Sequence, residues 1–220
     1  MNEQLPSFIT EASGRLGDRV YLKSAGTLRS RRYQPPTDSR TAKQQTVRVR
    51  FAQTAQAWAK LSEAQRLAWD KFGAARPRTA PTWAETNTQT GYGAFMTLML
   101  KRLHAQPEAD FLTGPPPAAF AGDIIAVTAQ AGAGEIVWQA SGPNGAGVVT
   151  ELLAQPMRRT TSLPNLEKYR TLAFAAFSDK HGAETTACAP GLWACAMRFV
   201  HMGTGQTTAL TVLPPVWVQA

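Results

Sequence analysis

A Gly-Pro-Pro-Pro run at residues 114–117 separates two stretches of sequence with different hydrophobic periodicity. Before the run, apolar residues recur every three or four positions, which is the spacing of one face of an α-helix. After it, short β-type runs alternate with turn clusters such as Ser141–Gly145. Because consecutive prolines form a stiff, non-helical spacer, we expect a boundary between two structural regions here.

The first stretch predicts three helices. Thr37–Thr41 offers N-cap residues for a helix over about twenty positions, with one apolar face. Ser62 and Gln65 form a capping-box pattern for a second helix to about Phe72, and Thr90 can cap a third over Gly91–His104. The first helix places on one face Val47, Phe51, Ala55, Trp58 and Leu61. The aromatic residues expected to form the helical core, or in part to meet a neighbouring subunit, are Phe51, Trp58, Trp69 and Phe72.

The second stretch predicts about seven strands in about 100 residues, as in an immunoglobulin- or fibronectin type III-like β-sandwich. The expected runs are Ile124–Gln130, Glu135–Ala140, Gly147–Leu153, Met157–Ser162, Tyr169–Phe177, Ala194–His201 and Thr207–Leu213. Tyr169–Phe177 is apolar on both faces. This favours a central strand partly covered by the helices, with an oligomer contact as the alternative.

Positive charge is concentrated near the N-terminus. Ten Lys/Arg and two Asp lie between Arg15 and Arg50, a surplus equal to the net charge of +8 of the whole chain. Two β-type runs, Arg19–Lys23 and Leu28–Tyr33, flank a turn at Ser24–Thr27 and predict a hairpin. A basic extended segment favours docking on an acidic partner, with nucleic-acid contact or a merely solvated surface as the alternatives. The expected partner-binding residues are Arg15, Arg19, Lys23, Arg29, Arg31, Arg32, Tyr33, Arg48 and Arg50.

The predicted class is therefore α+β: an extended β-arm, a small helical domain and an all-β sandwich. The predicted boundaries are 1–37 for the basic arm, 38–106 for the helical domain, 107–121 for a Pro-rich linker and 122–220 for the sandwich.

Other residue patterns favour no catalytic, metal or cofactor site. Cys188 and Cys195 are expected to be free thiols, with a local disulfide as the alternative. No histidine has a companion at metal-ligand spacing, and Gly142–Gly147 lacks the Lys-Ser/Thr of a phosphate loop. The first residues carry no signal-peptide pattern, so we expect a protein made in a cytoplasm and not bound to a membrane.

Several motifs resemble a family of uncharacterised phage- and prophage-encoded structural proteins. The matching features are Gly14 and Gly17, Arg29–Tyr33, Pro36-x-x-x-x-Thr41, Gln44-Gln45 with Arg48 and Phe51, Trp58-x-x-Leu61-Ser62-x-x-Gln65-Arg66-x-x-Trp69, and Thr90-Gly91 with Tyr92 and Phe95. Asp18 departs from the pattern, because the family often has another glycine at this position. The resemblance implies a fibronectin-like C-terminal domain and a non-enzymatic particle component.

The expected function is that of a virion structural protein, made in the host cytoplasm, that decorates a capsid or forms part of a connector or tail. Its expected partners are acidic surfaces of other virion proteins and further copies of itself. Two alternatives remain open. One is a nucleic-acid-binding accessory protein that uses the basic arm on phosphates. The other is a carbohydrate- or receptor-binding module with Trp138, Trp193 and Trp217.

Overall fold

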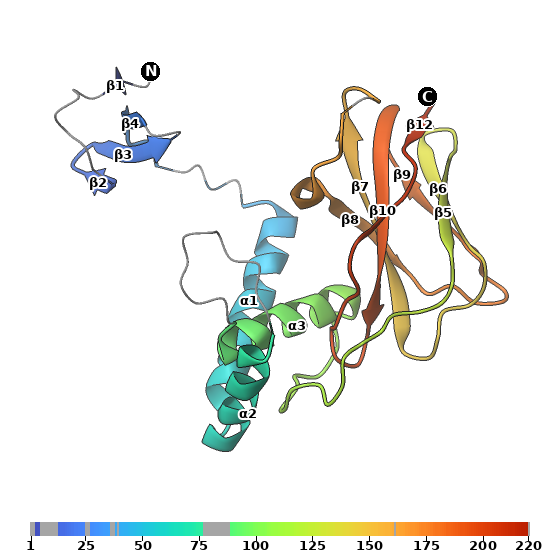
Figure 1. Cartoon of the computed structure of the whole chain (residues 1–220), viewed down its shortest axis with the longest axis horizontal. Coiled ribbons are helices and arrows are strands. Elements are labelled where there is room, and N and C mark those ends of the chain that lie inside the picture. The colour runs from blue at the N-terminus through green and yellow to red at the C-terminus, as the bar shows by residue number, and fades with distance from the viewer. Residues whose placement is uncertain are drawn as a thin grey trace. The chain divides into compact units, whose positions relative to one another are not determined.

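A computed structural model describes residues 3–4, 13–24, 27–35, 38, 40–76, 89–160 and 162–219. Within these residues the chain is a mixed α+β protein with three α-helices and one short 3-10 helix, Leu166–Lys168 (Figure 1). It divides into two compact units, Met1–Gln45 and Thr46–Ala220. The second unit contains both the helical region and the sheets that the sequence assigns to separate domains on either side of residues 107–121.

The first unit contains a four-stranded antiparallel sheet. Its strand order is β1-β4-β3-β2, formed by Glu3–Gln4, Thr27–Arg32, Arg19–Ser24 and Gly14–Leu16. The predicted hairpin is confirmed by the β3–β4 pairing, but Ala25 and Gly26 of its predicted turn lie outside the described residues. The two further strands were missed because one spans two residues and the other begins at a glycine.

A two-residue turn, Gly17-Asp18, joins β2 to β3. Gly17 has φ +62°, a backbone conformation that suits glycine, and Leu16 pairs directly with Arg19 across the turn. The Asp18 carbonyl accepts a hydrogen bond from Tyr33 N–H at 2.6 Å. The turn is therefore tight even though its second residue is aspartate where the resembling family often has glycine.

The three helices are α1 (Ala42–Lys60), α2 (Glu63–Ala74) and α3 (Gly91–Ala105). The predicted caps of the last two are confirmed: Ser62 and Gln65 form a capping box on α2, and Thr90 Oγ1 accepts from Gly93 N–H at the start of α3. Thr41 Oγ1 likewise accepts from Gln44 N–H at 3.3 Å before α1. Of the other predicted N-cap residues, Thr37 and Ser39 lie outside the described residues, as does the segment 77–88 between α2 and α3.

Two glycines allow α2 and the start of α3 to approach closely. A methyl group on Gly73 would lie 2.5 Å from the Gln89 carbonyl oxygen, and one on Gly91 would lie 2.6 Å from Asp70 N. The Asp70 carboxylate also accepts a hydrogen bond from Gly91 N–H at 3.1 Å. Both positions exclude a larger side chain unless the backbone shifts.

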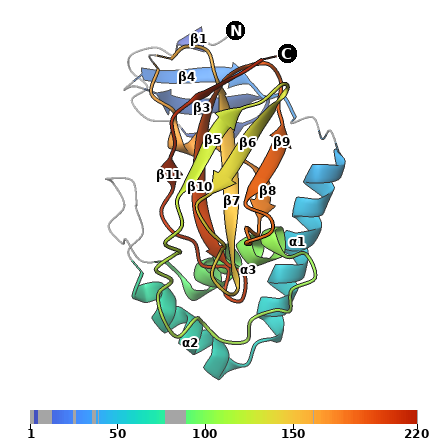
Figure 2. The same cartoon turned by 90° about the vertical axis from the view of Figure 1, so that its right-hand side faces the viewer.

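Two sheets follow the helices. The first has the strand order β5-β6-β9, formed by Val127–Ala131, Glu135–Ala140 and Ala183–Ala187. The second has the order β11-β10-β7-β8, with β12 also paired to β10. Its strands are Thr211–Val212, Gly191–His201, Val148–Met157, Arg170–Ala175 and Val216–Val218. In Figure 2, β5 and β6 lie in front of β7 and β10. Side chains of both sheets share one hydrophobic core that includes Trp138, Leu152 and Met197.

Some predicted strands differ from the observed ones. The predicted strand Met157–Ser162 is wrong, because β7 ends at Met157. Tyr169–Phe177 was expected to be a central strand, but the corresponding β8 is at the end of its sheet. Its predicted cover by the helical region is confirmed at Phe174, whose ring lies 4.9 Å from the ring of His104 on α3.

Helix α3 packs on this second sheet through a buried ion-pair network. Lys101 Nζ lies 2.9 Å from both carboxylate oxygens of Glu151 on β7, and Arg198 Nε on β10 lies 2.6 Å from Oε2. Thr171 on β8 donates to the same carboxylate. Glu151 is fully buried. A satisfied buried carboxylate therefore fixes the helix against three neighbouring strands.

Among the residues that the structure describes, no helix has both the length and the apolar character needed to cross a membrane.

Candidate functional site

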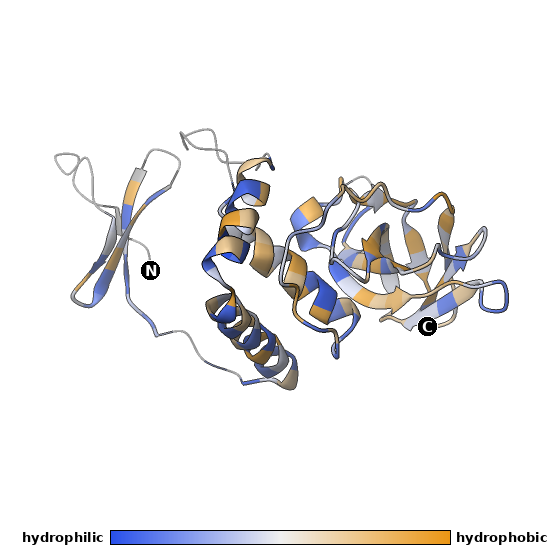
Figure 3. Ribbon diagram, turned by 90° about the horizontal axis from the view of Figure 1, so that it is seen from below, coloured by the Kyte–Doolittle hydropathy of each residue, from blue (hydrophilic) through white to orange (hydrophobic). Residues whose placement is uncertain are grey.

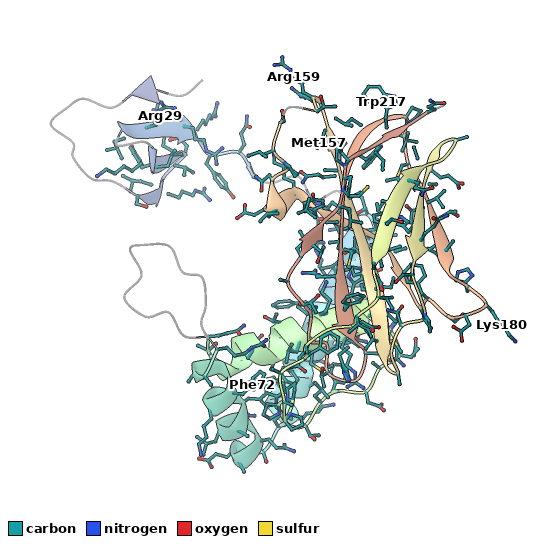
Figure 4. All side chains as sticks on the ribbon, turned by 45° about the vertical axis from the view of Figure 1, so that its right-hand side comes forward. Arg29, Phe72, Met157, Arg159, Lys180 and Trp217 are labelled. Carbon is teal, nitrogen blue, oxygen red and sulfur yellow. The ribbon has the colours of Figure 1, made fainter. Side chains whose placement is uncertain are left out.

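The candidate interaction site is the basic sheet, which we define as strands β2, β3 and β4 with their six cationic residues. Between Gly14 and Arg32 the only acidic residue is Asp18. Figure 3 shows hydrophilic and hydrophobic positions interleaved along these strands, and Figure 4 shows Arg29 on β4. The cationic residues are Arg15, Arg19, Lys23, Arg29, Arg31 and Arg32.

The strand register distributes these cations over both faces of the sheet. Arg15 and Arg31 pair with Val20, and Arg29 pairs with Leu22, so these three arginines share one face. The other face carries Arg19, Lys23 and Arg32, together with Tyr21, Leu28 and Ser30. Each face therefore presents three positive charges next to apolar side chains.

Two arginines of the basic sheet contact other residues of the first unit. The Arg15 guanidinium lies 3.8 Å from the centre of the Tyr33 ring, and its Nε donates to the Gly17 carbonyl at 2.9 Å. Arg19 Nη1 donates to Ser30 Oγ at 3.0 Å. Tyr33, which is itself a predicted partner-binding residue, therefore packs against Arg15 and supports its guanidinium.

Four cations of the basic sheet remain directed to solvent. Lys23, Arg29, Arg31 and Arg32 are exposed, and their side chains make no hydrogen bond or ion pair within the described part of the chain. Exposed arginines that lack local acidic partners can bind carboxylates or phosphates in a bidentate manner.

The other two predicted partner-binding residues, Arg48 and Arg50, lie on α1 in the second unit. Arg48 is exposed and Arg50 is half-buried. Helix α1 contains Lys43, Arg48, Arg50 and Lys60, but no acidic residue.

The predicted aromatic core of the helices is present in part. Trp69 is fully buried and packs edge-on against Phe72 and Phe95, with ring centres 5.6 and 5.2 Å apart. Trp58 packs against Tyr92 and Phe95. Phe51, in contrast, is 50% exposed, and Val47 is 61% exposed. Phe51 is therefore not part of the buried helical core, and its alternative role at a contact with a neighbouring subunit stays a prediction.

Sequence reasoning missed the Lys101–Glu151–Arg198 network. Burial acts to raise the pKa of Glu151, but hydrogen bonds from Arg198 and Thr171 and the charge of Lys101 lower it from 4.5 to about 2. A glutamate inside the apolar run Val148–Ala154 is an unusual residue for a strand core. The sequence therefore pointed to Glu151 but not to its partners, which lie 47 and 50 residues away along the chain.

The remaining candidate residues do not converge on one site. Within the described residues, no group of three or more His, Cys, Asp or Glu could hold a metal ion. Cys188 and Cys195 are free thiols, and burial raises the pKa of Cys195 to about 12. Of the three tryptophans proposed for sugar binding, Trp138 is buried and Trp193 is half-buried, while Trp217 on β12 is 60% exposed (Figure 4).

A cavity of about 400 Å³ lies in the second unit between α1, the start of α2 and the segment 111–113. Its lining is mostly amide and aliphatic, including Gln53, Gln56, Leu61 and Leu112. It contains no pair of groups arranged for acid–base or nucleophilic chemistry.

No protein-family model matches the chain, and no curated protein matches its sequence. The functional argument therefore depends on the chemistry of the described residues.

Proposed function

We propose that the chain is a non-enzymatic structural protein of a phage or phage-like particle, which anchors through its basic sheet on an acidic surface of another virion protein. The proposal covers a capsid-decorating, connector or tail component present in several copies. The observation that carries it is the register pairing of Arg19 with Arg32 in a sheet that has cations on both faces. Like charges directly opposite each other destabilise a strand pair, so such a sheet gains stability when a partner supplies carboxylates.

The strand order supports a fibronectin type III-like sandwich as the C-terminal domain. The first, second and fifth strands after the helices, β5, β6 and β9, form one sheet. The fourth strand, β8, pairs with the third, β7, rather than with the fifth as in constant-type immunoglobulin domains. The two sheets share one core, as sandwich architectures require.

The resemblance to phage-encoded proteins is supported by the roles of its motif residues. Ser62 and Gln65 cap α2, Trp69 is the buried centre of the helical core, and Gly91 is needed at the contact between α2 and α3. These four matching residues therefore have architectural roles in this chain, as expected for a motif that specifies a scaffold.

The test is incorporation into particles. Particles produced by cells that carry the gene are purified on a density gradient, and the chain is quantified with either the wild-type sequence or the double variant Arg29→Glu/Arg31→Glu. We expect the wild-type chain in the particle fraction and at least about tenfold less of the double variant, because two contacts become repulsive.

The matched control is Arg158→Glu/Arg159→Glu, which makes the same charge change at two exposed arginines outside the basic sheet. It should be incorporated like the wild type. Absence of the chain from particles, or equal incorporation of both double variants, would refute the proposal. Binding to DNA or RNA with a steep salt dependence, in place of incorporation, would favour the nucleic-acid alternative.

A further inference from the structure

Strand β8 is an unprotected edge of its sheet. It pairs only with β7, and no backbone hydrogen bond joins residues 171–175 to any other described segment. After Arg170 the strand reads Thr-Leu-Ala-Phe-Ala, without charge or proline. Natural edge strands usually carry charged residues or proline, which prevent pairing with another chain. This edge is therefore chemically open to an added strand.

The other strands at the sheet borders are better protected. On the opposite side, Ala133 forms a parallel bridge with Gln219, which closes the gap between the two sheets. Strand β9 carries a charged residue, Glu184, whose carboxylate lies 3.2 Å from His181 Nε2. Within the described residues, β8 is thus the border strand that combines six residues with an uncharged centre.

Two cationic side chains, Lys101 and Arg50, lie near the contact between β8 and α3. His104 packs on Phe174, and Lys101 Nζ lies 6.0 Å from the centre of the same ring. Burial, together with the charges of Lys101 and Arg50, lowers the pKa of His104, which places Arg50 of α1 in the same neighbourhood. Lys101 and Arg198 share the single carboxylate of Glu151. Lys101, Arg198 and Arg50 together therefore carry more positive charge than the one carboxylate of Glu151 neutralises.

Arg50 is available to a ligand. It makes no hydrogen bond or ion pair through its guanidinium within the described residues. Phe51, the next residue on α1, is half-exposed. Cationic and apolar groups therefore lie together on this helix.

We propose that the β8 edge is a docking site for an extended acidic segment of a partner protein, which adds to the sheet as an antiparallel or parallel strand and directs carboxylates toward Arg50. Main-chain hydrogen bonds supply affinity in such strand addition, and alternate side chains supply specificity. A second copy of this chain fits less well, because its own β8 carries no carboxylate to match the positive charge. The inference deepens the proposed function and rests on it, since the partner is a further virion component.

The test uses the full chain carrying Arg29→Glu/Arg31→Glu, so that the basic sheet does not compete for the probe. The probe is a capped peptide of sequence SEVEVEVS, and the readout is amide hydrogen exchange resolved to individual residues. We expect slower exchange at residues 170–175 when the peptide is added. The lysine peptide SKVKVKVS should give no protection.

A matched pair of variants tests the charge contact. Arg50→Glu should weaken the binding of SEVEVEVS about tenfold or more. Lys60→Glu makes the same change in charge on the same helix and should leave the binding unchanged. Thermal unfolding of both variants checks that each remains folded.

The proposal is overturned if SEVEVEVS leaves residues 170–175 unprotected, if the lysine peptide protects them equally, or if Arg50→Glu binds like Lys60→Glu. It is also overturned if protection rises with chain concentration in the absence of peptide, because a second copy would then occupy the edge. If the peptide experiment fails, the proposal of particle incorporation through the basic sheet still stands. If the peptide binds but the chain is not incorporated into particles, the proposed virion function is wrong.

Discussion

Arg19 on β3 lies directly opposite Arg32 on β4 in the antiparallel register. The Arg19 side chain donates a hydrogen bond to Ser30 Oγ, whereas the Arg32 side chain is exposed and makes no hydrogen bond or ion pair within the described residues. Like charges directly opposite each other destabilise a strand pair, and under the proposed function an acidic partner would relieve this repulsion.

Replacing one member of this pair should therefore separate sheet stability from partner binding. Arg32→Glu converts the pair with Arg19 into an ion pair and should stabilise β3 and β4 by about 0.2–1 kcal/mol. The measurement is amide hydrogen exchange in β3 and β4, which should become slower while incorporation into particles falls. Arg32→Gln, which only removes the repulsion, should have an intermediate effect on both. Faster exchange in Arg32→Glu would contradict this view of the basic sheet.

Glu151 should make the stability of the chain depend on pH at the acid end. Its pKa is lowered from 4.5 to about 2 in the folded state. The unfolded chain therefore binds the proton more readily, so the stabilising contribution is present above pH 4.5 and is lost as the pH falls toward 2. Thermal unfolding measured from pH 7 downward should show this loss in the wild type.

The variant Glu151→Gln should lack that acid-end component. At neutral pH it should be destabilised by about 3–5 kcal/mol, because Lys101 and Arg198 keep their charges without a buried counter-ion. Glu135→Gln, a change at a half-buried glutamate on β6, is the control. An acid-end profile of Glu151→Gln that matches the wild type would show that the network does not act as described.

The close contact between α2 and α3 should not tolerate a methyl group. Gly91→Ala would place Cβ within 2.6 Å of Asp70 N, and we expect a loss of about 1–3 kcal/mol in unfolding free energy. Gly182→Ala, at a position with nothing within 4 Å, should change stability little. Equal melting temperatures for the two variants would contradict the packing at this contact.

Cys195 should resist alkylation in the folded chain. It is fully buried, and burial raises its pKa to about 12, so almost no thiolate forms near neutral pH. Mass spectrometry after iodoacetamide treatment should find Cys195 unmodified until denaturant is added. Rapid labelling under native conditions, or a disulfide with Cys188, would contradict the structure.

The parts of the fold that depend on local chemistry could be predicted from the sequence. The Ser62–Gln65 capping box and the Thr90 cap define the starts of two helices, and the short β-rich run Glu135–Ala140 gives β6 with its observed bounds. The hairpin of β3 and β4 follows from β-type residues on either side of a turn.

Features that depend on tertiary contacts could not be predicted in this way. Periodicity shows which face of α1 is apolar, but not that its first half, with Val47 and Phe51, extends beyond the packed core. The place of β8 at a sheet edge depends on strand order. Strands β9 and β12 were missed because Ala183–Ala187 is weakly apolar and Val216–Val218 is short and follows two prolines.

The most direct test of the central claim is the number of copies of this chain in gradient-purified particles, determined by quantitative mass spectrometry. The account predicts several copies per particle, a number that is reproducible between preparations and falls after a high-salt wash, because exposed charge pairs are screened by salt. It also predicts that Arg29→Glu/Arg31→Glu is depleted from the particles. Particles without the chain, or with the same number of copies of the double variant, would contradict the account.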